Sequence, residues 1–192
     1  LVTTGFLVAC APPPAPGGGA SSQTQTPQTL VVMTHDSFAV SEDVIAQFES
    51  ENNATVQFLK AGDAGEMVSK ACLSKGNPLA DVLFGVDNTF FSRAIDCDIF
   101  LPYRSPGLAN IPRDLQYDTE HRLLPMDYGY VNLNYDRAWF EQHELPVPQR
   151  LEDLVKPEYK GLLVMPNPAT SSPGLAFLLT TISAFGSDGN YS

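Results

Sequence analysis

The chain has 192 residues, of which 43% are hydrophobic, and its net charge is −11. This size and composition allow one domain, or one and a half, with a buried core. Nucleic-acid binding is disfavoured because phosphates are bound by clusters of Lys and Arg, and an acidic chain is poor in such clusters. For the same reason, docking on an anionic membrane is disfavoured. An acidic protein suits a cationic ligand, although solubility alone also accounts for the charge.

The first residues have the character of an export signal. Residues 1–10 are mostly apolar, and we expect them to be the end of a signal peptide whose start is missing. Leu7-Val8-Ala9-Cys10 resembles a bacterial lipobox, which predicts a lipid anchor on Cys10; the alternative is an ordinary secretory peptide with an incidental cysteine. Residues 11–29 are rich in Pro, Gly and Ser and predict a disordered linker. No run reaches the roughly 18 apolar residues of a membrane-spanning helix.

The folded part begins with a regular alternation of strands and helices. Apolar runs predict strands at 30–34, 55–59 and 81–84. Between them we expect a helix from Ser41, which is a good N-cap, and a helix over 66–75 that ends at Gly76. Asn88 or Thr89 is expected to cap a third helix. The order β-α-β-α-β-α predicts an α/β fold with parallel strands.

The later part of the chain is less regular. Residues 102–119 are rich in turn formers and predict irregular structure. Residues 130–135 alternate with period two and predict an extended run, and 161–165 predict a buried strand. A short helix is expected over 151–156, and Pro173 opens a helix that runs to Phe185.

Cysteine and histidine spacing leaves one question open. Cys72 and Cys97 lie in predicted helices, and either a disulfide or two buried free thiols is consistent with the sequence of an exported protein. The three histidines are scattered and no CxxC occurs, so no metal site and no cofactor are predicted.

Polar or aromatic segments follow the predicted strands or open the late helix. These segments are 34–38, 85–88, 127–130 and 170–174. Ligands of open α/β sheets bind at the carboxyl ends of the strands, so these segments predict one pocket. Tyr128 and Tyr130 offer flat faces that attract cations, and Gly129 lets the backbone pass close to a neighbour. Hydroxyls and free N–H groups around Ser171 offer an anion site. Each segment also has a purely structural explanation, as a helix cap or as the lining of a hinge.

These segments together resemble the thiamine-binding subunit of bacterial ABC importers, a type II periplasmic solute-binding protein. The matching segments are His35-Asp36-Ser37-Phe38, Gly85-Val86-Asp87-Asn88 and Thr170-Ser171-Ser172-Pro173-Gly174. His35 stands where the family often has Tyr, and Asn167-Pro168 replaces its usual Asp-Pro. The resemblance implies two α/β lobes joined by a hinge: a first lobe over 30–129 and a second over 130–192, truncated because we expect this chain to be a fragment.

The resemblance also implies a function and a site. We expect a protein that binds a thiamine-like cation and delivers it to a membrane permease. The expected ligand-binding residues are His35, Asp36, Ser37, Asp87, Asn88, Asp127, Tyr128, Ser171, Ser172 and Gly174. The same class of protein with ferric iron, a polyamine or a phosphonate as its ligand is the alternative. A thiaminase-like enzyme is disfavoured, since such enzymes use a catalytic cysteine and Cys72 lies on a helix flank rather than at a strand end.

Overall fold

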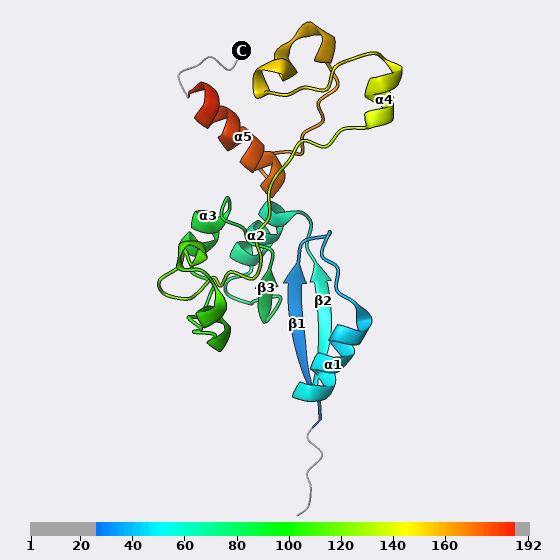
Figure 1. Ribbon diagram of the computed structural model, residues 1–192. Coiled ribbons are helices and arrows are strands. Elements are labelled where there is room, and N and C mark those ends of the chain that lie inside the picture. The colour runs from blue at the N-terminus through cyan, green and yellow to red at the C-terminus, as the bar shows by residue number, and fades with distance from the viewer. Residues whose placement is uncertain (1–25, 187–192) are drawn as a thin grey trace, which may run out of the picture.

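A small parallel sheet forms the centre of the structure, a computed structural model that describes residues 26–186. Its strands are β1 (Gln28–Thr34), β2 (Ala54–Lys60) and β3 (Val82–Phe84), in the order β2-β1-β3 (Figure 1). Both pairings are parallel, which confirms the predicted strands and their direction. The carboxyl ends of all three strands therefore lie at one edge of the sheet.

Three helices accompany this sheet: α1 (Glu42–Asn52), α2 (Ala64–Leu73) and α3 (Phe91–Asp96). Ser41 occupies the N-cap of α1 as expected, although its side chain makes no capping hydrogen bond. Helix α2 begins two residues earlier than predicted because the Asp63 side chain accepts a hydrogen bond from the N–H of Ala64. The N-cap of α3 is Phe90, so the expectation that Asn88 or Thr89 caps this helix is wrong.

The core lies beside α2 and is compact. One cluster joins α2 to α3 through Ala64, Val68, Phe90 and Ala94. A second cluster sits at the sheet and contains Met33, Ala61 and Met67. By contrast, Val44 and Phe48 on α1 remain 54% and 41% exposed. The buried interior is therefore concentrated around α2, which begins at the carboxyl end of β2.

A disulfide between Cys72 and Cys97 answers the question left open by the sequence. The two Cα atoms are 5.5 Å apart, and the bridge ties the C-terminal turn of α2 to the end of α3. It reinforces the contact that the first core cluster makes between the same two helices.

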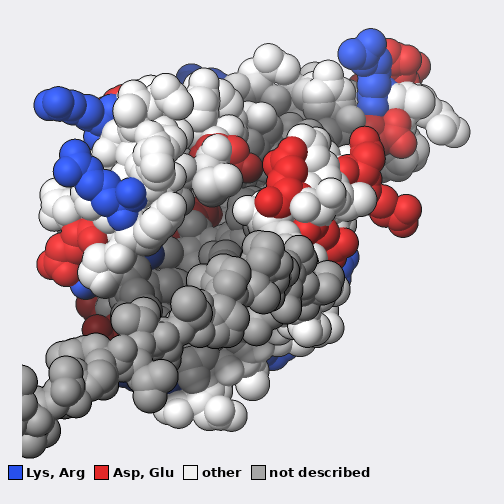
Figure 2. All heavy atoms as spheres, turned by 90° about the horizontal axis from the view of Figure 1, so that it is seen from below, with Lys and Arg blue, Asp and Glu red and all other residues white. Residues whose placement is uncertain are grey.

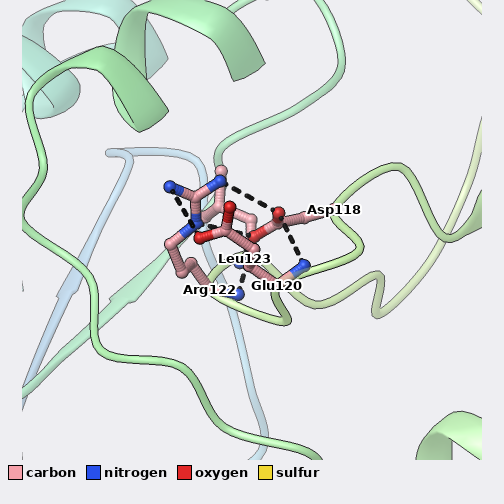
Figure 3. A network of polar contacts seen from close by, with 4 residues as sticks. All are labelled: Asp118, Glu120, Arg122 and Leu123. Atoms are coloured by element: carbon pink, nitrogen blue, oxygen red, sulfur yellow. Dashed lines mark hydrogen bonds and ion pairs between the residues drawn. The ribbon is translucent and has the colours of Figure 1, made fainter.

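The segment after α3 is irregular, as predicted, apart from 3-10 turns at Pro106–Asn110 and Arg113–Leu115. It is held by Asp118, which is 6% exposed. The Asp118 carboxylate accepts hydrogen bonds from the N–H groups of Glu120, Arg122 and Leu123 and from the Arg122 guanidinium (Figure 3). Burial alone would raise the pKa of Asp118, but these hydrogen bonds outweigh it and lower the pKa to about 2.

The later part of the chain holds α4 (Arg137–Gln142), two 3-10 turns at Leu151–Val155 and Pro157–Tyr159, and α5 (Ser172–Phe185). The helix opened by Pro173 is confirmed, whereas α4 was not predicted. The predicted strand at 161–165 is wrong, and the run 130–135 joins no sheet. Both runs are exposed, because no neighbouring strand in the described part of the chain pairs with them.

Figure 1 shows α4 and the two 3-10 turns that follow it lying apart from the sheet, whereas the first turn of α5 lies beside α2. On the face seen in Figure 2, acidic side chains gather in groups and Lys and Arg lie mostly toward the outline. Within residues 26–186, no helix is long and apolar enough to cross a membrane. Cys10 and most of the predicted linker lie outside the described residues.

Candidate functional site

A cavity of about 400 Å³ lies where the loop after β1 meets the start of α5. Its lining comes from three places: the end of β1, the start of α2, and the turn that leads into α5. The lining residues are Asp36, Ser37, Asp63, Pro166, Ser171 and Pro173. The structure thus brings three of the predicted site residues, Asp36, Ser37 and Ser171, to one cavity and adds Asp63.

Asp36 fixes the loop that carries Ser37. Its N–H donates to the carbonyl of Gly62 (2.9 Å), and its Oδ1 accepts from the N–H of Gly62 (3.0 Å). The Lys60 ammonium also donates to the Asp36 carbonyl (2.8 Å). These bonds lock the loop after β1 to the loop after β2, so Asp36 holds the wall of the cavity in place as well as lining it.

His35 lies in a cluster of aromatic rings beside the cavity. Its ring centroid is 6.4 Å from that of Phe38 and 6.3 Å from that of Phe84. Gly85 has a positive φ of 112°, and a Cβ there would come 2.5 Å from His35 Cδ2. Glycine at this position therefore lets the His35 ring lie against the loop that follows β3. His35 itself does not line the cavity.

Asp63 is not among the ligand-binding residues expected from the sequence. It follows the carboxyl end of β2 directly after Gly62, where φ is 95°, and it caps α2. A signal was present, because the rule that points to strand ends applies to β2 as much as to β1 and β3. The structural explanation of Asp63 as a cap is correct and is compatible with its place in the cavity wall.

The start of α5 supplies the opposite wall. Ser171 is 3% exposed, occupies the N-cap position and makes no capping hydrogen bond with its side chain. Pro173 has no N–H, which leaves the N–H groups of Ser172 and Gly174 in the first turn. Gly174 is needed for the turn itself, since a Cβ there would overlap the carbonyl of Pro166 at 2.4 Å. A buried hydroxyl at the positive end of a 14-residue helix suits an oxygen-rich or anionic group.

Asp87 and Asn88 lie at the same sheet edge but not in the cavity. Asp87 Oδ1 accepts hydrogen bonds from the Thr89 hydroxyl (2.7 Å) and from the N–H groups of Thr89 (3.2 Å) and Phe90 (3.3 Å). This carboxylate therefore stabilises the turn that precedes α3. Asn88 is exposed.

Asp127 and Tyr128 stand away from the cavity on an exposed segment. Tyr128 is 74% and Tyr130 84% exposed. The close backbone approach expected at Gly129 is not found among the described residues, because a Cβ there would meet nothing within 4 Å. A separate hollow of about 520 Å³ around α4, lined by residues such as Tyr135 and Phe140, contains none of the predicted site residues. No cluster of three or more potential metal ligands occurs within residues 26–186.

Comparison with known sequences places the chain in a family. The sequence pattern of bacterial extracellular solute-binding proteins matches residues 77–191. The chain belongs to this family. Among curated relatives of this solute-binding protein, the thiamine-binding periplasmic protein of Salmonella typhimurium is 29% identical over 165 residues, or 82% of this chain and 47% of the relative. The protein of the same description from Brucella suis is 29% identical over 177 residues, covering 88% and 50% of the two chains.

Solved structures confirm the fold of this solute-binding protein. A periplasmic thiamin binding protein superimposes with a TM-score of 0.65 at 23% identity, over 92% of this chain and 53% of the other. The periplasmic binding protein AfuA from Actinobacillus pleuropneumoniae, with fructose-6-phosphate bound, gives a TM-score of 0.62 at 22% identity, over 84% and 51%. The chain therefore has the α/β periplasmic-binding-protein fold and spans about half the length of the relatives it matches.

Proposed function

We propose that this protein is the extracytoplasmic solute-binding component of an ABC importer and that its ligand is thiamine or a thiamine phosphate. The observation that carries the proposal is the cavity that joins Asp36, Ser37 and Asp63 to Ser171. The curated relatives described above support the choice of ligand, since each bears a name that specifies thiamine.

The cavity combines two kinds of chemistry. Asp36 and Asp63 place carboxylates on one side, which favours a cationic group. Ser171 and the N–H groups of the first turn of α5 face them from the other side and suit a hydroxyl or phosphate. Thiamine carries a cationic ring and a hydroxyethyl arm, and its phosphates extend that arm. One molecule can thus satisfy both walls.

The remaining predicted residues belong to the proposal for the complete protein. We place His35 beside the arm of the ligand, and Asp87 and Asn88 along its path at the sheet edge. Asp127 and Tyr128 lie on the segment that connects the sheet-containing part to α4, where a flat aromatic face would stack on a cationic ring. In this proposal residues 30–129 form the first lobe, residues 130–192 begin the second, and binding draws the lobes together about that segment.

The proposed function also implies where the protein is located and which partner it has. We propose that the protein is exported, that Cys10 carries a lipid anchor, and that the loaded protein docks on a membrane permease. Membrane fractionation and mass spectrometry of the mature N-terminus test the anchor; an unmodified Cys10 in a soluble mature protein would exclude it.

Calorimetric titration tests the ligand. The protein expressed from its complete reading frame should bind thiamine more tightly than a neutral pyrimidine analogue, because the carboxylates attract the cationic ring. Ferric iron, a polyamine and a phosphonate serve as competing ligands in the same series. Tighter binding of any of these, or release of the pyrimidine during incubation with thiamine, would contradict the proposal.

A further inference from the structure

The first turn of α2 contacts the turn before α5 through a backbone hydrogen bond. The N–H of Gly65 donates to the carbonyl of Thr170 over 2.8 Å. A Cβ at Gly65 would come within 2.8 Å of Phe90 Cζ and within 2.9 Å of both Ala169 O and Thr170 Cα. Two of these three neighbours are backbone atoms, so any residue larger than glycine would push the two segments apart.

Apolar packing reinforces the same junction. Leu175, in the first turn of α5, packs against the cluster of Ala64, Val68, Phe90 and Ala94. Residues 169–175 are therefore held against α2, whereas α4 and the turns that follow it lie away from the sheet (Figure 1).

The junction borders the cavity directly. Asp63, two residues before Gly65, lines one side of the cavity, and Ser171, which follows Thr170, lines the other. A change in the separation of Gly65 and Thr170 must therefore change the distance between these two walls.

We propose that the Gly65–Thr170 contact is a latch that keeps the cavity closed around its ligand, and that Gly65 is a positioning residue for ligand retention. This inference rests on the proposed function as a solute-binding protein. The Gly65 N–H is one of the helix N-terminal donors that water can satisfy once the contact opens. The latch is consequently weak: a net contribution equivalent to about tenfold in the closing equilibrium is typical of one such bond. A weak latch slows release of the ligand without preventing it.

If Gly65 mattered only for the helix α2, replacing it by alanine would be expected to stabilise the protein. Glycine is a poor helix former relative to alanine, so Gly65→Ala would stabilise α2 if the helix were the only constraint. The latch predicts that the same substitution separates the two cavity walls.

The test compares Gly65→Ala with Gly76→Ala in the protein from the complete reading frame. A Cβ at Gly76 meets nothing within 4 Å, which makes it a matched control. Stopped-flow measurements should show thiamine dissociating about tenfold faster from Gly65→Ala, with little change in the association rate and with the wild-type rates kept by Gly76→Ala. Unchanged dissociation from a folded Gly65→Ala variant would overturn the latch.

Hydrogen–deuterium exchange measured without ligand tests the latch independently of whether thiamine is the ligand. The N–H groups of the non-proline residues in 166–171, which are Asn167, Ala169, Thr170 and Ser171, should exchange faster in Gly65→Ala than in wild type, whether or not thiamine binds. Leu175→Ala, which loosens the same junction and leaves the backbone of α2 intact, should have the same effect and serves if Gly65→Ala does not fold. Wild-type exchange of 166–171 in the folded variants would refute the latch, whereas failure of wild type to bind thiamine would refute only the proposed ligand.

Discussion

Individual carboxylates in this protein hold loops in place at the points where a ligand is expected. Asp36 connects the loop after β1 to Gly62 through a hydrogen bond, Asp63 caps α2, and Asp87 stabilises the turn before α3. The sequence pointed to Asp36 and Asp87 through their strand-end positions but could not tell a cap from a ligand contact, since both tasks select Asp. Asp63 was not among the expected ligand-binding residues because an Asp that follows a Gly is equally typical of a simple turn.

The two tasks of Asp87 can be separated by substitution. Asp87→Asn should leave the free energy of unfolding nearly unchanged because the Asn side-chain oxygen can accept the same hydrogen bonds in the turn before α3, whereas Asp87→Ala should cost about 1 kcal/mol. If the carboxylate also faces the ligand, as proposed, Asp87→Asn should weaken thiamine binding by roughly 1–3 kcal/mol. Chemical denaturation and calorimetry on both variants measure these effects. Wild-type affinity in Asp87→Asn would show that Asp87 only holds the turn before α3.

Asp118 provides a stability test away from the cavity. Replacing this buried carboxylate by Asn should cost about 2–4 kcal/mol, because the Arg122 guanidinium loses its partner and backbone N–H groups lose a charged acceptor. Glu120→Gln is the matched control: Glu120 also pairs with Arg122, but its side chain is 66% exposed, so the loss should be at most a few tenths of a kcal/mol. Equal losses in the two variants would contradict the role given to Asp118.

The pH dependence of the same pair follows from the lowered pKa. The pKa of Asp118 falls from 3.8 to about 2 on folding, so its stabilising contribution is present above about pH 4 and is lost as the pH falls toward 2. The difference in unfolding free energy between wild type and Asp118→Asn should therefore shrink over that interval. A difference that stays constant between pH 4 and pH 2 would show that the carboxylate is not the source of the stability.

At the scale of elements, the part of the chain that alternates strictly between strand and helix was predictable, whereas in the later part the helix opened by Pro173 was predictable and the strands were not. β1, β2 and β3 are short apolar runs whose partners lie within the described chain, so local pattern and tertiary structure agree. Residues 130–135 and 161–165 carry equally good strand patterns but have no partner strand in the described part of the chain. A strand needs a neighbour to satisfy its N–H and C=O groups, and sequence pattern alone does not supply one.

The Cys72–Cys97 bridge should contribute measurably to the stability of α2 and α3. It closes a loop of 25 residues, for which chain entropy predicts a contribution of about 3.5 kcal/mol. Replacing both cysteines by alanine should lower the free energy of unfolding by about that amount. Reductant should destabilise wild type similarly and leave the double variant unaffected; equal stability of wild type with and without reductant would contradict a structural role for the bridge.

At the scale of the whole molecule, the cavity depends on segments far apart in the sequence. The end of β1 and the start of α2 form one side, and the turn into α5 forms the other. The family resemblance identified the loop after β1 and the turn into α5 as site candidates, but not the start of α2. The contact between Gly65 of α2 and Thr170 is a tertiary contact with no signature in local pattern. The chain spans about half the length of these relatives.

We propose that the cavity at the start of α5 receives the oxygen-bearing arm of thiamine or of its phosphate. Calorimetric titration of thiamine monophosphate into Ser171→Ala tests it most directly, with Thr180→Ala as the control. Thr180 is a hydroxyl residue on the same helix, away from the cavity, and its Oγ1 bonds to the carbonyl of Ala176. We predict that Ser171→Ala weakens binding about tenfold while Thr180→Ala binds as wild type does. Equal affinity in wild type and both variants would show that the ligand does not reach this cavity.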